Sequence, residues 1–597
     1  MASRLLSNSF TKVGITALRP SLAIRPKLRA YSTQSSSSVS DTCQITTLPN
    51  GIRVTTENTP GHFSAVGVYV DAGSRYETEE THGVSHILDR LAFKVGNSQQ
   101  HIVNMLSVQL AMINDFSTTK RDSTQMLADL ESLGGNIMCS SSREAIMYQS
   151  AIFRQDLPRI LSLFSDVVRN PRIDPVEVDE QRQTALYEIE EIWSKPEMIL
   201  PEILHTAAYQ GNTLGNPLLC PPEKLEVMTC ESIRGFRDTW YRPERMVIAA
   251  AGARHEDLVR LAEEYFGDIP KSEEPLDSVE THKEMHSHQL SAVSASLSPS
   301  STPTAHHPYY HTATAQKPSL IKNLTTAAAS LLKPSPAAQP EPLSPRELAT
   351  LPAHYTGGHT FIENPELPYT HLHIAFEGLP IYDPDLYALA TLQILLGGGG
   401  SFSAGGPGKG MYSRLFTKIL NQYHWVESCV AFNHCYTDSG LFGVAASCKP
   451  EYNHLLVEVV CRELDLVTRS DVGIVGVTEE ELRRAKNQLK SSLLMNLESR
   501  MVQLEDLGRQ VQVMGKKTPV EEMLRRIEEV DLETLRRVAG RVLRGAVRVT
   551  SGGSGEVTVV AQGDLRGLKD VGKTVEKYGL GAGMVTKMGK WKRQMSM

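Results

Sequence analysis

The sequence predicts an α+β protein of two homologous α/β halves, each a mixed sheet packed with helices. The chain has 597 residues, and a prior of roughly 150 residues per domain gives two to four domains. Three elements of the first half recur in the same order in the second half, which indicates an internal duplication with a period of about 300 residues. The two halves are expected to face each other across a cavity.

The first half is expected to span residues 40–272. Residues 45–60 and 64–77 are rich in Val, Ile and Thr and predict two strands separated by turn residues. Residues 81–94 predict a helix on which Val84, Ile87, Leu88 and Leu91 share one face. A long helix at 174–193 and a strand feeding a helix at 241–268 complete the pattern.

The composition changes at residues 273–353, which are rich in Ser, Pro, Thr and Ala and predict a disordered linker. Six histidines in or near it, at positions 282, 286, 288, 306, 307 and 311, are interpreted as solvated side chains, because nothing there fixes a coordination geometry.

The second half is expected to span residues 354–580, followed by a basic tail at 581–597. Residues 370–396, 477–499 and 555–579 repeat the three elements of the first half. A glycine run at 397–410, in which eight of fourteen residues are glycine, is expected to lie between two helices. Asp383 is expected to cap the helix before it, with Pro384 in the first turn. In the helix after it, one face is expected to carry Tyr412, Leu415, Phe416, Ile419 and Leu420.

The N-terminus resembles a mitochondrial matrix presequence. Before Asp41 it has six basic residues, many serines and no acidic residue, and it lacks the long apolar core of a secretory signal. Residues 1–31 are therefore expected to be removed in the matrix. A basic tail without a targeting role is the alternative.

Bulk properties exclude some classes of protein. The net charge of -7 and the pI near 6.3 offer no general attraction to nucleic acid. No run of about 18 apolar residues predicts a membrane-spanning helix. The eight cysteines are scattered and are interpreted as free thiols of a reducing compartment.

Residues 82–86 suggest a zinc site, because His82 and His86 are four positions apart and two imidazoles on one helical face can share an ion. A hydrolytic site also needs a third ligand and a general base. Histidine spacing alone therefore does not establish a metal centre.

Four segments resemble the insulinase/pitrilysin metallopeptidase family: DAGSRYE at 71–77, GVSHILDRLAFK at 83–94, ALYEIEEI at 185–192 and the glycine run. Catalytic members carry the zinc motif HxxEH on the first helix and a further glutamate ligand on the later long helix. Laid over this chain, the pattern falls on His86, Asp89, Arg90 and Glu188. His82 lies outside it.

The resemblance implies that the motif is degenerate and that this chain holds no metal and has no catalytic residue. Asp89 is shorter than the glutamate base, and Arg90 cannot ligate because its guanidinium stays cationic. An ion pair of Glu188 and Asp89 with Arg90 is the structural interpretation. The chain then resembles the noncatalytic alpha subunit of a heterodimeric zinc endopeptidase that removes presequences. Zinc is expected in the catalytic beta subunit, which would share the cavity.

The glycine run resembles the substrate-binding loop of such alpha subunits, and it is expected to bind basic presequences of precursor proteins. Its residues are Gly397, Gly398, Gly399, Gly400, Ser401, Phe402, Ser403, Ala404, Gly405, Gly406, Pro407, Gly408, Lys409 and Gly410. A phosphate-binding loop does not fit, because Ser403 and Gly410 stand where the motif needs Gly and Ser or Thr. The alternative is that the run is a flexible connector without a binding role.

Three consecutive glutamates, Glu479, Glu480 and Glu481, are a candidate cluster for presequence arginines. A solvated helix start is the commoner explanation of three consecutive glutamates. Two other functions stay open: a core structural subunit of the respiratory cytochrome reductase complex, and a self-sufficient zinc peptidase.

Residues 95–116 interrupt the family pattern. Without these 22 residues, Arg90 and Glu188 would be about as far apart in sequence as the family pattern places its ligands. The codons of Val95-Gly96 and Phe116-Ser117 can contain splice-donor-like and splice-acceptor-like sequences. A retained intron is therefore the hypothesis, and a genuine surface loop is the alternative.

Sequencing of spliced transcripts across Lys94 and Ser117 tests the intron hypothesis. We expect the major transcript to lack the codons for residues 95–116. Their presence in every transcript would show that the segment is a genuine loop.

Overall fold

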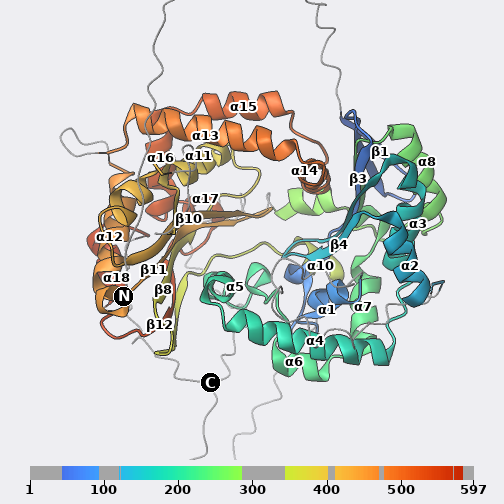
Figure 1. Ribbon diagram of the computed structural model, residues 1–597, viewed down its shortest axis with the longest axis horizontal. Helices are drawn as coiled ribbons and strands as arrows, with labels where there is room; N and C mark the ends of the chain where they lie inside the picture. Colours follow the sequence, from blue (N-terminus) through green and yellow to red (C-terminus); the bar gives the residue numbers. More distant parts are fainter. Residues whose placement is uncertain are drawn as a thin grey trace, which may run out of the picture. The chain divides into compact units, whose positions relative to one another are not determined.

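The computed structural model describes residues 43–92, 118, 120–121, 123–285, 343–400, 411–469, 476–568 and 570–582, all within one unit, Thr42–Met597 (Figure 1). The presequence at 1–31, the insertion at 95–116, the middle of the linker, residues 401–410 of the glycine run and the tail from 583 lie outside the described residues.

The first half contains a six-stranded sheet in the order β1-β2-β6-β3-β5-β4. Its strands are β1 (Cys43–Thr47), β2 (Arg53–Glu57), β3 (Phe63–Val70), β4 (Asn136–Ser141), β5 (Ile146–Phe153) and β6 (Met246–Ala251). Its helices are α1 (Val84–Arg90), α2 (Ser123–Leu133), α3 (Leu157–Arg169), α4 (Pro175–Trp193), α5 (Pro196–Ala208), α6 (Pro222–Val227), α7 (Cys230–Trp240) and α8 (His255–Phe266).

The second half contains a six-stranded sheet in the order β7-β12-β8-β11-β10-β9. Its strands are β7 (Gly358–Glu363), β8 (Thr370–Glu377), β9 (Gly398–Gly400), β10 (Val426–Cys435), β11 (Gly440–Cys448) and β12 (Thr558–Gly563). Its helices are α11 (Leu386–Leu396), α12 (Asn453–Leu466), α13 (Glu479–Leu497), α14 (Arg500–Met514), α15 (Val520–Glu528), α16 (Leu532–Leu543), α17 (Arg548–Ser551) and α18 (Val571–Lys577).

The two sheets share one topology, which confirms the predicted pair of related α/β halves. The parallel pair β2–β6 corresponds to the parallel pair β7–β12, and the other described strand pairs are antiparallel. The helices α4 and α13, each of 19 residues, hold equivalent places in the chain. The sheets differ at their edges, since β1 is an extra strand in the first half and β9 in the second.

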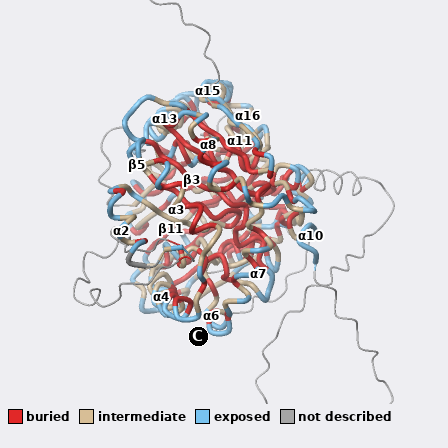
Figure 2. The backbone as a smooth tube through the Cα atoms, turned by 90° about the vertical axis from the view of Figure 1, so that its right-hand side faces the viewer, coloured by how far each residue is buried: buried red, intermediate tan, exposed pale blue. Residues whose placement is uncertain are grey.

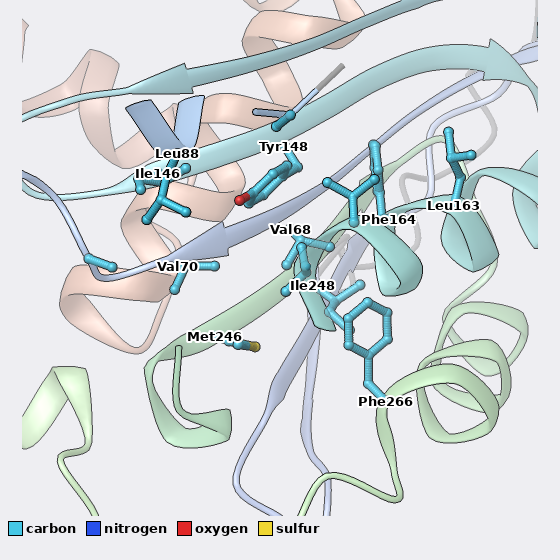
Figure 3. Packing of buried hydrophobic residues seen from close by; sticks show 14 of the residues in the cluster. Val68, Val70, Leu88, Ile146, Tyr148, Leu163, Phe164, Met246, Ile248 and Phe266 are labelled. Atoms are coloured by element: carbon cyan, nitrogen blue, oxygen red, sulfur yellow. The ribbon is translucent and has the colours of Figure 1, made fainter. Parts of the chain in front are cut away.

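One face of each sheet packs against helices of its own half. In the first half, Val68 and Ile248 of the sheet meet Phe164 of α3 and Phe266 of α8 (Figure 3). In the second half, Phe376 of β8 belongs to a core shared with α11, α12 and α16. The buried part of the chain follows these layers through the interior (Figure 2).

The opposite face of each sheet is covered by a helix from the other half (Figure 1). Helix α5 of the first half packs on β12, β7 and β8, and helix α14 of the second half packs on β6, β3 and β2. Leu200 and Leu204 of α5 share a core with Val560 of β12, whereas Leu504 of α14 shares one with Tyr69 of β3. Because both faces are covered, β6 and β12 are buried throughout.

Polar contacts fix the register of α14 on the first sheet. The hydroxyl of Tyr69 donates to the Leu504 carbonyl at 3.0 Å, and the Arg53 guanidinium donates to the Val511 carbonyl at 2.9 Å. A Cβ atom at Gly508 would lie 2.2 Å from the Tyr69 ring, so this close approach of helix and strand requires glycine.

A buried ionic cluster joins the two halves. Arg75 donates to Asp438 of the second half at 2.8 Å and to Glu144 of the first half at 2.7 Å. The side chain of Arg75 is 1% exposed and that of Asp438 is 0% exposed. Burial opposes the charge of Arg75, but the Asp438 and Glu144 carboxylates raise its pKa well above the ordinary value. The arginine therefore stays charged within the seam.

Both described ends of the predicted linker belong to the fold, so the prediction of disorder over all of 273–353 is wrong at its ends. His282 is 1% exposed and its ring lies 3.5 Å from Asp71, which contradicts its interpretation as a solvated side chain. The described C-terminal end of the linker begins at residue 343 and contains α10 (Pro345–Thr350). Arg346 of α10 pairs with Glu284, near the other described end, at 2.8 Å. Met285 is fully buried, and its sulfur lies 3.4 Å from the Arg75 guanidinium. These contacts give the residues near 285 a fixed structure although their composition resembles that of a linker.

Two local predictions near the glycine run are wrong. Helix α11 begins at Leu386 with Asp385 at the N-cap, so Asp383 lies two positions before the cap. The Asp383 carboxylate accepts from the Asp385 backbone at 2.9 Å and pairs with Arg541 at 2.7 Å. After the run, the expected helix is a short π-helix, Phe416–Leu420, and Tyr412 precedes it and is 72% exposed. Tyr412 thus does not share the buried face.

Helix α1 is held at its N-terminus by a buried carboxylate. Both oxygens of Glu77 accept backbone hydrogen bonds, from Gly83 N and Ser85 N at 2.8 Å each. Gly83 has φ of 89°, and a Cβ atom there would lie 2.2 Å from the Cys220 sulfur, so glycine is required. Burial raises the pKa of Glu77 to about 7, although the hydrogen bonds from Ser85 and Gly83 favour its charged form.

Replacement of Arg75 by methionine should destabilise the protein by about 3–5 kcal/mol, because Asp438 and Glu144 would be left buried without their cation. Urea unfolding monitored by circular dichroism measures this. The control is Arg254→Met, which removes an exposed pair with Asp257 and should change stability by less than about 0.5 kcal/mol. Equal effects of both substitutions would contradict the role assigned to the seam.

Glu77 should make stability fall as pH rises. Its pKa is about 7 in the folded protein and 4.5 in the reference state, so the folded state binds more protons between these values. The resulting stabilisation is fully present below pH 4.5 and lost as pH rises through 7, a change of up to about 3 kcal/mol.

The measurement compares the free energies of unfolding of the parent chain, Glu77→Gln and the exposed control Glu451→Gln between pH 5 and 8. We expect the difference between the parent and Glu77→Gln to shift in favour of the variant as pH rises, and Glu451→Gln to follow the parent. Parallel curves for all three proteins would refute the assignment.

Candidate functional site

The residues matched to the zinc motif come together where α1 meets α4. His86, Asp89 and Arg90 lie on α1, Glu188 lies on α4, and β4 closes the site with Ser141. Val84, Ile87 and Leu88 bury the opposite face of α1 in the core, and Figure 3 shows Leu88 beside Ile146. Burial of this apolar face orients the polar residues toward α4.

Arg90 forms an ion pair with Glu188, one of the two carboxylates expected to pair with it. The guanidinium is largely buried and the Glu188 side chain is 30% exposed. Burial lowers the pKa of Arg90 to about 10, and the adjacent Asp89 carboxylate opposes this effect. Asp89 accepts hydrogen bonds from the backbone and the hydroxyl of Ser141 at 3.4 Å each.

His86 is buried, and its Nδ1 accepts a hydrogen bond from the backbone of Cys220 at 3.3 Å. His82 precedes α1, and its carbonyl accepts a hydrogen bond from the Cys220 thiol at 3.7 Å. The two histidines therefore do not lie on one helical face as the spacing suggested, because the helix starts only at Val84.

These residues do not fit a zinc ion. Arg90 occupies the second histidine position, carries a fixed positive charge and engages the carboxylate that would be the third ligand. Within the described part of the chain, no group of three or more His, Cys, Asp or Glu side chains is arranged to hold a metal. The chemistry available at this place is an ion pair between two helices.

The described start of the glycine run is a strand. After α11 the chain turns at Gly397, with φ of 55°, and β9 pairs antiparallel with β10. A Cβ atom at Gly397 would lie 2.5 Å from Ser413, and one at Gly398 would lie 1.9 Å from the Cys429 carbonyl. By contrast, within the described residues nothing beyond the adjacent residues of the chain lies within 4 Å of a Cβ position at Gly399 or Gly400.

The fold therefore requires glycine at 397 and 398, whereas no contact with the described residues requires it at 399 and 400. Val430, which pairs with Gly398 across the sheet, is 40% exposed. The predicted substrate-binding residues Ser401 to Gly410 lie outside the described residues, so their contacts are not part of this geometry.

The three glutamates at the start of α13 divide between two roles. Glu481 accepts hydrogen bonds from Arg414 at 3.1 and 3.2 Å and completes the capping box with Thr478, so it is a structural residue rather than part of an exposed cluster. Glu479 and Glu480 line a surface hollow, and Glu480 pairs with Arg484.

Sequence reasoning missed three further acidic residues of that hollow, Glu528, Glu529 and Asp531. They lie about fifty positions along the chain, on α15 and the turn that follows, and only the folding of α15 against α13 brings them to Glu479. Arg483 and Lys486 also line the hollow, so acidic groups predominate but basic groups are present.

None of the helices in the described residues combines the length and the apolar character needed to cross a membrane.

Comparison with protein families gives two matches. Residues 53–115 and 110–222 match the insulinase family (peptidase family M16), and residues 228–489 match the peptidase M16 inactive domain. The two stretches of the first match meet inside the segment predicted as an insertion, at residues 95–116.

Similar proteins include the mitochondrial-processing peptidase subunit alpha of Neurospora crassa, 50% identical over 88% of this chain and 87% of the relative. A probable subunit alpha of Schizosaccharomyces pombe is 40% identical over 89% and 88% of the two chains, and the human subunit alpha is 31% identical over 85% and 81%.

Among solved structures, a chain of complex III2 from Candida albicans with Inz-5 bound is similar, with a TM-score of 0.61 and 16% identity over 90% of this chain and 99% of that one. At this identity the likeness concerns the fold alone. The sequence relatives carry the assignment, and they agree with the resemblance found in the motifs. The chain belongs to the insulinase family of peptidases, M16.

Proposed function

We propose that this chain is the noncatalytic, substrate-recognising alpha subunit of a heterodimeric mitochondrial processing peptidase. The observation that carries the proposal is the Arg90–Glu188 ion pair, which stands where the resemblance places two zinc ligands of the catalytic family members. The 50% identity to a relative named subunit alpha supports the same function.

In this proposal the reaction is divided between two subunits in the mitochondrial matrix. The catalytic beta subunit holds zinc and activates water. This chain holds no metal and supplies no catalytic residue; it receives the extended, basic presequence and guides it into the shared cavity. The glycine run from Gly397 to Gly410 makes the main contact with the presequence, and glycine lets a bound chain approach the backbone closely.

Charge supports a basic peptide as the substrate and gives no support for nucleic acid. The chain has a net charge of -7, and five carboxylates line one surface hollow. Glu528 pairs with Lys490 and Asp531 caps α16, so presequence arginines would compete with these contacts. Carboxylates bind arginine through charge-assisted hydrogen bonds, which suit the arginines of presequences.

A structural subunit of the respiratory cytochrome reductase complex is the second candidate, favoured by the likeness to a chain of complex III2. That likeness is limited to the fold, whereas the relatives named subunit alpha are two to three times more similar in sequence. Copurification with cytochromes would favour this candidate. A self-sufficient peptidase is opposed by Arg90.

Presequence cleavage should require both subunits. We expect cleavage of a precursor by a mixture of this chain with the beta subunit, and neither protein alone should be active. Full activity of the beta subunit alone would show that this chain is dispensable. Zinc-dependent cleavage by this chain alone would show that it is itself a peptidase.

The glycine run is tested by deleting residues 401–408, which leaves β9 in place. We expect precursor affinity of the mixed heterodimer to fall by at least tenfold, about 1.4 kcal/mol. Heterodimer formation and the zinc content of the partner should not change. The control Glu451→Gln should bind like the parent chain, and a deletion variant that binds and cleaves normally would disprove the role of the run.

A further inference from the structure

Helices α1 and α4 are in contact at the residues matched to the zinc motif. Helix α1 has only seven residues, and its last residue, Arg90, is one turn from His86 and buried like it. The Arg90 guanidinium crosses to α4 and pairs with Glu188. A single side chain thus links the end of a short helix to the middle of a long one.

The carboxylates set an electrostatic requirement at this place. Glu188 is partly buried and Asp89 lies next to Arg90 in the chain. A carboxylate taken out of water needs a cation or several hydrogen bonds, and losing its partner is strongly destabilising. Either a divalent ion or a guanidinium can supply the positive charge.

We propose that Arg90 is a built-in replacement for a metal ion: its fixed charge holds Glu188 and joins α1 to α4 without any cofactor. Of the three positions matched to zinc ligands, His86 and Glu188 would then have ligating side chains and only Arg90 would not. A histidine at position 90 would be four residues from His86 on the same face of α1 and directed at Glu188, which gives two imidazoles and one carboxylate. This inference concerns the site itself and holds whether or not the chain handles presequences.

Zinc binding tests the proposal directly on the purified full-length chain after treatment with a chelator. We expect Arg90→His to bind one Zn²⁺ per chain about 100-fold more tightly than the parent, measured by competition with a chromogenic chelator. Arg90→Met, which has no ligand at this position, should bind no better than the parent.

Two double variants show whether the zinc occupies the proposed ligands. Arg90→His with Glu188→Gln, and Arg90→His with His86→Ala, should each lose at least about tenfold in affinity relative to Arg90→His alone. Unchanged affinity in both would mean that the ion is held elsewhere, for example by a cysteine thiol, and would overturn the proposal.

Thermal unfolding tests the replacement independently of any activity. Arg90→Met should unfold about 3 °C lower than the parent, because Glu188 loses its cation. The double variant Arg90→Met with Glu188→Gln should recover much of this shift. Added Zn²⁺ should raise the unfolding temperature of Arg90→His but not that of Arg90→Met or the parent.

An Arg90→His chain that folds but gains neither zinc affinity nor zinc-dependent stability would refute the proposal. An unchanged unfolding temperature for Arg90→Met would show that the pair holds nothing. If Arg90→His unfolds in the absence of metal, refolding with and without Zn²⁺ decides: metal-dependent refolding supports the replacement, and equal failure contradicts it.

Discussion

Arg75 is the interaction on which the arrangement of the two halves depends. Its guanidinium binds Glu144 from the first half and Asp438 from the second, with almost no exposure to water. Asp438 also accepts a hydrogen bond from the backbone of Ala353 at 2.6 Å, and Thr437 N donates to Glu144 at 3.0 Å. The same few charges therefore fix both halves and the returning end of the linker.

Each half also covers one face of the other half's sheet with a helix. Each sheet has one apolar face covered by its own helices and another covered by α5 or α14 from the opposite half. Separation of the halves would expose both of these second faces. Burial of apolar surface contributes roughly 25 cal/mol per Å², so the halves stabilise each other through α5 and α14, and the arginine fixes the geometry in which they meet.

Much of the fold follows from periodicity, which is a local property. The helix of Val84, Ile87 and Leu88 was predictable because spacing in sequence determines which residues share a face, and the duplication because the same elements recur in the same order. The pairing of Arg90 with Glu188 was expected from the resemblance to the family's zinc motif. The packing of α5 and α14 on the sheet of the opposite half was not predictable, since the apolar face of a helix does not determine which sheet it packs against. Likewise, Asp383 has the chemistry of a helix cap, and only the fold brings Arg541 to it.

In the candidate site too, some roles could be predicted from the sequence and others depend on contacts that only the fold creates. Glu481 looks like its two neighbours in sequence, yet Arg414 and Thr478 make it structural. The glycine run contains glycines of two kinds. Those at 397 and 398 are required by a turn and by contact with β10, whereas those at 399 and 400 face open space among the described residues. Glycine in a strand costs conformational entropy without gaining contacts.

Among the described residues, the fold accounts for the first two glycines, and no contact accounts for the next two. Under the function proposed above, a substrate chain lying close to the backbone gives glycine a role at 399 and 400, since a side chain there would stand in its way. The proposed division of labour agrees with the other half, where a guanidinium stands at the position of a zinc ligand. Under that proposal, contact with the substrate is the role of the run.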